Sequence, residues 1–225
     1  MNEYLQANEY FDYDNPKVAS LTQEIIAGVD DDPVQKAIAL YSYVRDHYSY
    51  NPYQFSLSPD QLKASHCVEQ SESYCIPKAV LLGAMCRSIG IPARLGLVDV
   101  KNHISSQKLL DLLKSDVFVM HGYVDLYLND RWVKATPAFD SKLCHFLGIA
   151  TMEFNGTEDS VFSEYNLDGA KHMEYLKQHG TFADVPVQLI YRAVLEAYPH
   201  LMEDSGVRQQ MAQQSLEKDA ELEQV

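Results

Sequence analysis

The residue in this sequence that most clearly suggests chemistry is Cys75, near the start of the run SYCIPKAVLLGAMCRSIGIPARLGLV. Pro77 is well tolerated in a helix only in the first turn, so Cys75 is expected in that turn as well. The unpaired N–H groups there favour a thiolate and stabilise an oxyanion. The position therefore fits a nucleophile for acyl chemistry, whereas the alternative is a small buried cysteine without chemistry.

The helix that carries Cys75 is expected to be central to the fold. Ser73 is a suitable N-cap, and Gly90 followed by Pro92 marks the end of the helix. Apolar residues cover most of the helix surface, which is typical of a buried helix. They are Ile76, Ala79, Val80, Leu82, Ala84, Met85 and Ile89.

A nucleophilic cysteine needs a base and a group that orients the base. His121 lies in the run VFVMHGYVDLYL, residues 117–128, whose loose alternation favours a β-strand. Asn129 and Asp130 then make a turn into RWVKATPAF, which completes a hairpin. The second strand and its exit carry Thr136 and Asp140, so the hairpin brings possible partners toward the histidine.

The runs GIPARLGL, HGYVDLYL and RWVKATP resemble the core of the transglutaminase-like superfamily of papain-type cysteine enzymes, over about residues 70–140. The resemblance implies an α+β fold in which the Cys-bearing helix packs on an antiparallel sheet, with extra helices at both ends. It also implies that Cys75 is the nucleophile, His121 the general base and Arg94 a supporting residue. The family usually has Asp where this chain has Thr136.

This departure leaves three candidates for the third catalytic residue. Asp140 ranks first, because in the resemblance the orienting group follows the histidine strand. Asp125 lies four positions after His121, and strand residues with that spacing share a face. The hydroxyl or carbonyl group of Thr136 is the third candidate.

The aromatic, proline-broken run from Tyr48 to Pro59 is expected to form a loop, and such loops often line clefts. Tyr53 or Gln54 from this loop could support an oxyanion site, although a structural role is the stronger expectation. We assign no metal and no cofactor, because two Cys/His pairs lack the paired spacing of a zinc motif. The pairs are His66 with Cys67 and Cys144 with His145; His103 is a weaker candidate base.

The chain is expected to form one transglutaminase-like domain over residues 1–225, with a core at about 30–145. An arm over residues 1–15 precedes the core, and a mainly helical extension over 146–225 follows it. Capping and periodicity predict several further helices. Three helices are predicted before the Cys75 helix: one from Pro16 to Ala27, one that begins at Pro33 and one that begins at about Asp60. Four follow it: one over SSQKLLDLLK with Ser105 or Ser106 as its cap, a short one that contains Leu143, Cys144 and Phe146, and two near 166–178 and 186–198. The polar chain from Glu203 is predicted to be a surface helix or a frayed tail.

Composition limits the classes of partner. Lys and Arg number 18 against 32 Asp and Glu, a formal charge of −14, which argues against nucleic acid or an anionic membrane. The absence of a leader-like start or a long apolar run favours a cytoplasmic location. The four cysteines, 67, 75, 86 and 144, are expected to be free thiols.

Together these features predict a cysteine enzyme that acts on a peptide or protein amide, as a protease, amidase or acyltransferase. Cys75 would attack the carbonyl carbon, and His121 would pass the proton to the leaving amine. The sequence does not distinguish hydrolysis from transfer, and it does not give the oligomeric state. The alternative is a peptide-binding module that keeps the fold without the chemistry, and Thr136 is the residue that favours it.

Overall fold

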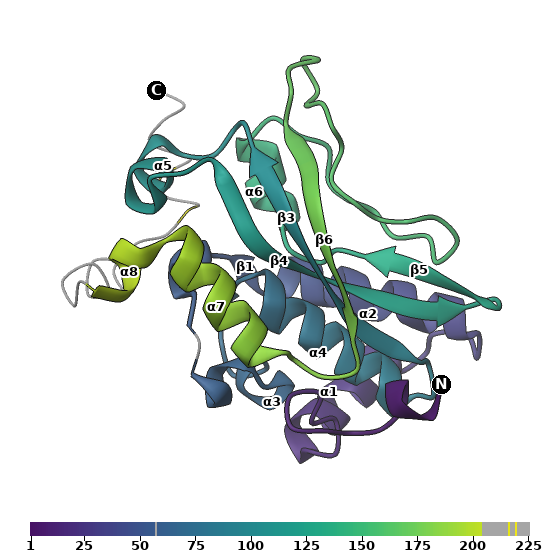
Figure 1. The fold of residues 1–225 in the computed structure, drawn as a ribbon. Helices are drawn as coiled ribbons and strands as arrows, with labels where there is room; N and C mark the ends of the chain where they lie inside the picture. Colours follow the sequence, from purple (N-terminus) through teal and green to yellow (C-terminus); the bar gives the residue numbers. More distant parts are fainter. Residues whose placement is uncertain (57, 204–215, 217–218, 220–225) are drawn as a thin grey trace.

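The fold is built on a four-stranded antiparallel sheet with the strand order β5-β4-β3-β6 (Figure 1). The computed structural model describes the whole chain apart from residues 57, 204–215, 217–218 and 220–225. The strands are β3 (Ala93–Asn102), β4 (Val117–Leu128), β5 (Arg131–Ala135) and β6 (Met173–Phe182). The mixed architecture is the α+β class that the sequence predicts.

Helix α4 (Cys75–Ser88) is the central helix and packs against β3 and β4 (Figure 1). Every residue from Cys75 to Arg87 is buried, as expected for a helix that is apolar on all sides. Helices α1 (Pro16–Ile26) and α2 (Pro33–His47) pack against α4 and cover it. The core therefore lies between this helical layer and the sheet.

One glycine lets α4 approach the sheet closely. A Cβ atom at Gly122 would lie 3.0 Å from the Cα atom of Ile76 and 3.2 Å from its backbone N. Gly122 follows His121 on β4, and Ile76 follows Cys75 on α4. The absence of a side chain at Gly122 therefore brings the first turn of α4 against the strand that carries the histidine.

The remaining elements are short and surround this core. Helix α7 packs against β4, and β1 pairs in parallel with β2. Their bounds are η1 Asn2–Tyr4, β1 Ser49–Tyr50, η2 Pro52–Gln54, η3 Pro59–Leu62, α3 Ala64–Cys67, β2 Glu72–Ser73, α5 Gln107–Leu113, α6 Ser141–Phe146, α7 Val187–Ala197 and α8 Pro199–Glu203. None of the described helices combines the length and the apolar character needed to cross a membrane.

Most predicted elements are confirmed. The helices begin at Pro16 and Pro33, α5 is capped by Ser106, and α7 covers most of 186–198. The hairpin turns at Asn129 and Asp130, which both have positive φ angles. The predicted cap of α4 was wrong by one residue, because Tyr74 is the N-cap and Ser73 lies in β2.

The helix predicted near 166–178 is wrong, since most of that segment forms or leads into β6. β6 is an edge strand in which only Met173 is buried, and its exposed side chains include Tyr175 and Leu176, so burial imposes no alternating pattern on its sequence. Pairing with β3 determines its structure instead. The C-terminal part is therefore not mainly helical where it is described, because it adds a strand to the central sheet. The predicted tail from Glu203 lies almost entirely outside the described residues.

The N-terminal arm does pack on the domain. Its Phe11 is completely buried, and the Arg87 guanidinium of α4 lies 3.9 Å from the centre of the Phe11 ring. All four cysteines are free and buried. The arm and α4 thus share one core.

Candidate active site

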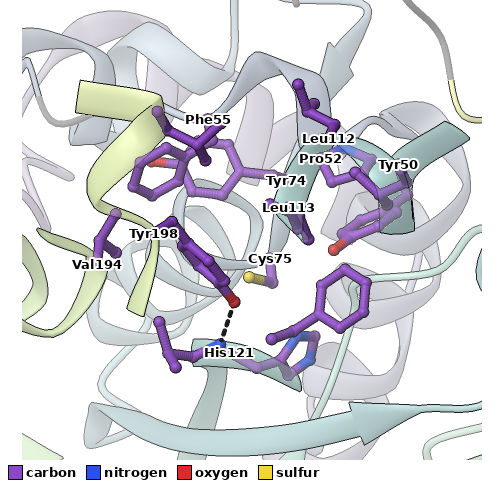
Figure 2. A pocket seen from close by; sticks show the side chains of 14 residues that line it. Tyr50, Pro52, Phe55, Tyr74, Cys75, Leu112, Leu113, His121, Val194 and Tyr198 are labelled. Carbon is purple, nitrogen blue, oxygen red and sulfur yellow. Dashed lines mark hydrogen bonds between the residues drawn. The ribbon is translucent and has the colours of Figure 1, made fainter. Parts of the chain in front are cut away.

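Cys75 is the first residue of α4, and Figure 2 shows its sulfur directed into a cavity. The backbone N–H groups of Gly122, Ile76 and Cys75 itself point toward the sulfur and lower its pKa. Two of these groups belong to the open end of the helix and one to β4. The same donors are suited to an oxyanion that forms next to the sulfur.

His121 lies on β4 immediately after a bulge. Val98 pairs with His121 and Val100 pairs with Phe118, so Asp99 alone faces the two residues between them. One of these, Met120, has a φ angle of 58°, and its N–H donates to the Asp99 carboxylate at 3.0 Å. A bulge changes the direction of the side chains next to it. The bulge at residues 119–120 therefore determines the direction in which the His121 side chain points from β4.

A cavity of about 80 Å³ joins Cys75 to His121, which both line it (Figure 2). The other lining residues are aromatic, aliphatic or proline, and they come from residues 50–55, the N-cap of α4, α5, β4, α7 with its C-cap, and α8. They are Tyr50, Pro52, Phe55, Tyr74, Leu109, Leu112, Leu113, Phe118, Val119, Val194, Tyr198 and Leu201.

Burial keeps both reactive groups neutral in this structure. It raises the pKa of the Cys75 thiol to about 11, which outweighs the effect of the backbone N–H groups. It lowers the pKa of His121 to about 4. At neutral pH the resting pair is therefore a thiol and an imidazole, and not a thiolate and an imidazolium.

The other side of His121 faces Thr136 across a second cavity of about 190 Å³, which both residues line. The imidazole Nε2 atom is buried and has no hydrogen-bond partner among the described residues. The ring packs instead against Phe162, with 5.2 Å between ring centroids. Packing, and not a hydrogen bond at Nε2, therefore holds the imidazole in place.

The two candidate carboxylates make other contacts. Asp140 caps α6 by accepting from the Leu143 N–H at 2.9 Å, and it also accepts from the Tyr50 N–H at 2.8 Å. Asp125 accepts from Arg94 at 3.0 Å, and the Arg94 guanidinium lies 3.9 Å from the centre of the Trp132 ring. Arg94 and Asp125 thus form an ion pair on the sheet, and neither lines the cavity with Cys75.

The two residues considered for an oxyanion site lie outside the cavity lining. The Tyr53 hydroxyl donates to Asp219 at 2.7 Å, and Gln54 is exposed. From the same loop, Tyr50 and Phe55 line the cavity instead. Among the described residues, no group of three or more His, Cys, Asp or Glu is placed to hold a metal ion.

Sequence reasoning missed Lys78, which is completely buried one turn after Cys75. Its ammonium donates to the carbonyl oxygens of Arg45, Tyr48 and Ala138, at 2.6 to 2.9 Å. These bonds connect α4 to the end of α2 and to the chain that leaves β5. A lysine among the apolar residues of the first two turns of the helix was the available signal.

Tyr198, at the end of α7, was also missed. Its hydroxyl donates to the Val117 carbonyl at 2.5 Å and accepts at 3.0 Å from the N–H of Val119, which is one of the two bulge residues. It therefore supports the segment that positions His121. No local pattern in the sequence links residue 198 to residue 119.

Comparison with known proteins gives a match to a family model and matches to solved structures. The family model described as "Transglutaminase-like superfamily" matches residues 19–137. One of these solved structures is a proposed cysteine protease from Cytophaga hutchinsonii, with 15% sequence identity and a TM-score of 0.46. The match covers 79% of this chain and 52% of that chain, so this chain spans about half the length of the protein it matches. A search of curated proteins finds no match.

Proposed function

The chain belongs to the transglutaminase-like superfamily, and from this membership we propose that it is a cysteine enzyme that acts on amide bonds of a peptide or protein. Cys75 is the proposed nucleophile and His121 the proposed base. The observation that carries the proposal is the shared cavity, which the sulfur and the imidazole line from two different elements. Backbone N–H groups at the start of α4 supply the electrostatic environment.

The proposed reaction starts from the neutral pair. The Cys75 sulfur bonds to the carbonyl carbon while its proton moves to His121, and the N–H groups at the start of α4 stabilise the oxyanion. The C–N bond then breaks as His121 gives this proton to the leaving amine. Water, or a second amine, adds to the thioester and regenerates the thiol, so the products are an acid or a new amide.

For the third position, we favour Thr136 over the two carboxylates. It lines a cavity together with His121, whereas Asp140 and Asp125 are engaged elsewhere. A hydroxyl group stabilises an imidazolium less than a carboxylate does, so the proposed site works as a Cys–His pair with weak support.

A binding module is the second candidate function. It is favoured by the buried Nε2 atom of His121, which has no hydrogen-bond partner among the described residues. In this case the cavity holds a peptide side chain, and the thiol does not react.

The pH dependence of iodoacetamide labelling distinguishes the two functions, with intact mass and peptide mapping as the measurement. If His121 acts as base, labelling of Cys75 becomes efficient once the imidazole loses its proton, near its pKa of about 4. An unassisted thiol instead labels faster only as the pH approaches about 11. His121→Ala is the matched control, and equal slow labelling of all four cysteines in the native protein would contradict the enzyme proposal.

A further inference from the structure

The cavity beside Cys75 has apolar walls that come from distant parts of the chain. Leu109, Leu112 and Leu113 of α5 line one part of it. Val194 of α7 and Leu201 of α8, which lie beyond the segment matched by the family model, line another part. Residues outside the core of the family thus shape the space next to the sulfur.

The lining of the cavity provides few hydrogen-bond or ion-pair partners for a charged group. Among the described residues that line it, His121 is the only one with a basic side chain, and burial lowers the pKa of this side chain to about 4, so it is neutral. Two of the three lining tyrosines already use their hydroxyl groups, since Tyr74 donates to the Ser56 carbonyl and Tyr198 binds the backbone of β4. A charged side chain placed here would lose its hydration without gaining a partner, so the cavity selects against it.

The volume of the cavity next to Cys75 indicates the size of the side chain that it can bind. At about 80 Å³ the cavity is roughly half the size of a 150 Å³ apolar cavity that accommodates benzene in another protein. A branched aliphatic side chain fits this space.

The chain itself places a leucine next to this site. Leu216 is only 4% exposed and lines a small cavity together with Tyr50, Leu109, Phe118 and His121. These four residues also line the cavity that holds Cys75. The surroundings of His121 thus already accommodate an isobutyl group.

We propose that the cavity binds an uncharged, branched aliphatic side chain, such as that of leucine, on the residue whose carbonyl group Cys75 attacks. The inference rests on the proposed function, because it assigns that residue to the acyl half of the amide. The Cα atom of this residue is bonded to the attacked carbon, so its side chain lies close to the sulfur. The apolar cavity occupies this space.

The test uses three chloromethyl ketones, derived from N-acetyl-leucine, N-acetyl-glycine and N-acetyl-glutamate. Each alkylates a thiol by displacing chloride, and each rate is normalised to its rate with glutathione. We expect the leucine reagent to label Cys75 at least about tenfold faster than the other two, since burying an isobutyl group favours its transition state. Peptide mapping identifies the labelled residue.

Two variants on α5 provide the matched comparison. Leu112→Glu places a carboxylate in the cavity wall and should remove the preference for leucine while the glycine reagent still reacts. Leu110→Glu makes the same change on the same helix at a residue that does not line the cavity, and it should keep the preference. Loss of the preference in both variants would overturn the proposal.

The remaining outcomes distinguish the proposed aliphatic preference of the cavity from the proposed reaction of Cys75. Fast, His121-dependent labelling at equal rates by all three reagents overturns the aliphatic preference and leaves the enzyme proposal standing. If Cys75 does not react, binding is measured on Cys75→Ala by NMR chemical-shift changes with N-acetyl-leucinamide and N-acetyl-glutamate amide. Selective binding of the leucine compound then supports the cavity and contradicts the enzyme, whereas equal or absent binding overturns both.

Discussion

The two sides of the His121 side chain differ in the contacts that surround them: many contacts fix the side of Cys75, and few fix the side of Thr136. On the side of Cys75, a glycine contact, a bulge, Lys78 and Tyr198 fix the position of the sulfur relative to the strand. On the side of Thr136 there is a cavity of about 190 Å³, and Nε2 lacks a hydrogen-bond partner among the described residues. Backbone packing therefore brings Cys75 and His121 to one cavity without a hydrogen bond to His121 Nε2 from the described residues.

The largest effect is expected when the close approach between Gly122 on β4 and Ile76 on α4 is prevented. In Gly122→Val, the new side chain collides with the backbone of Ile76, so the first turn of α4 must move away from β4. We expect overpacking to cost about 1–3 kcal/mol of unfolding free energy and the His121-dependent labelling of Cys75 to fall about 100-fold. Denaturant unfolding and labelling kinetics measure the two effects.

Val124→Ala is the control for this change. Val124 is buried on the same strand and contacts the α4 layer near Gly83, so its truncation lowers stability by a similar amount. The first turn of α4 should stay in place. If Val124→Ala slowed labelling as much as Gly122→Val, the loss would reflect stability and not the approach of the two backbones.

Lys78→Met tests the second support on the Cys75 side. It leaves three buried carbonyl groups without their donor, and we expect a loss of roughly 3 kcal/mol in unfolding free energy. The pH dependence gives a specific signature, because burial lowers the pKa of Lys78 to about 8. Between about pH 8 and 10.5 the folded protein has released a proton that the unfolded chain retains, so the native protein gains stability as the pH rises.

This gain should be absent in Lys78→Met, which no longer has the titrating group. Denaturant unfolding at pH 7.5 and pH 10 for both proteins measures it. A difference in unfolding free energy between the two proteins that stays constant over this range would show that Lys78 does not titrate in the folded state.

Thr136→Asp changes the side of His121 that faces the cavity of about 190 Å³. A carboxylate in the cavity next to His121 favours the imidazolium, so the pKa of His121 should rise from about 4 toward its ordinary value. We expect the labelling of Cys75 at neutral pH to become about tenfold faster, because the base then holds the thiol proton more firmly. NMR titration of His121 and labelling rates check both expectations, and Thr136→Asn, which adds no charge, should leave the pKa low.

The same contrast explains what the sequence could reveal. Cys75 and the β4–β5 hairpin were predictable because they depend on local signals, such as Pro77 near a helix start and Asn129–Asp130 at a turn. The bulge at Met120 was not, since it depends on Asp99 of the neighbouring strand. Long-range pairing also determines β6 and places Tyr198 at the site, and no short pattern encodes such contacts.

The smallest expected effect on Cys75 labelling is that of Asp140→Asn, which tests whether a carboxylate supports His121. Asn keeps one acceptor oxygen for the Leu143 N–H but presents its NH2 group to the buried Tyr50 N–H, so the free energy of unfolding should fall by about 1–3 kcal/mol. If Asp140 only caps α6 and binds the Tyr50 N–H, Cys75 labelling should change less than about threefold. Asp140→Ala, which loses both contacts, should also lower the free energy of unfolding by about 1–3 kcal/mol. A loss of labelling in Asp140→Asn well beyond threefold, measured where the variant is still fully folded, would instead assign Asp140 to catalysis, and the Thr136 side would then not be the only possible source of an orienting group.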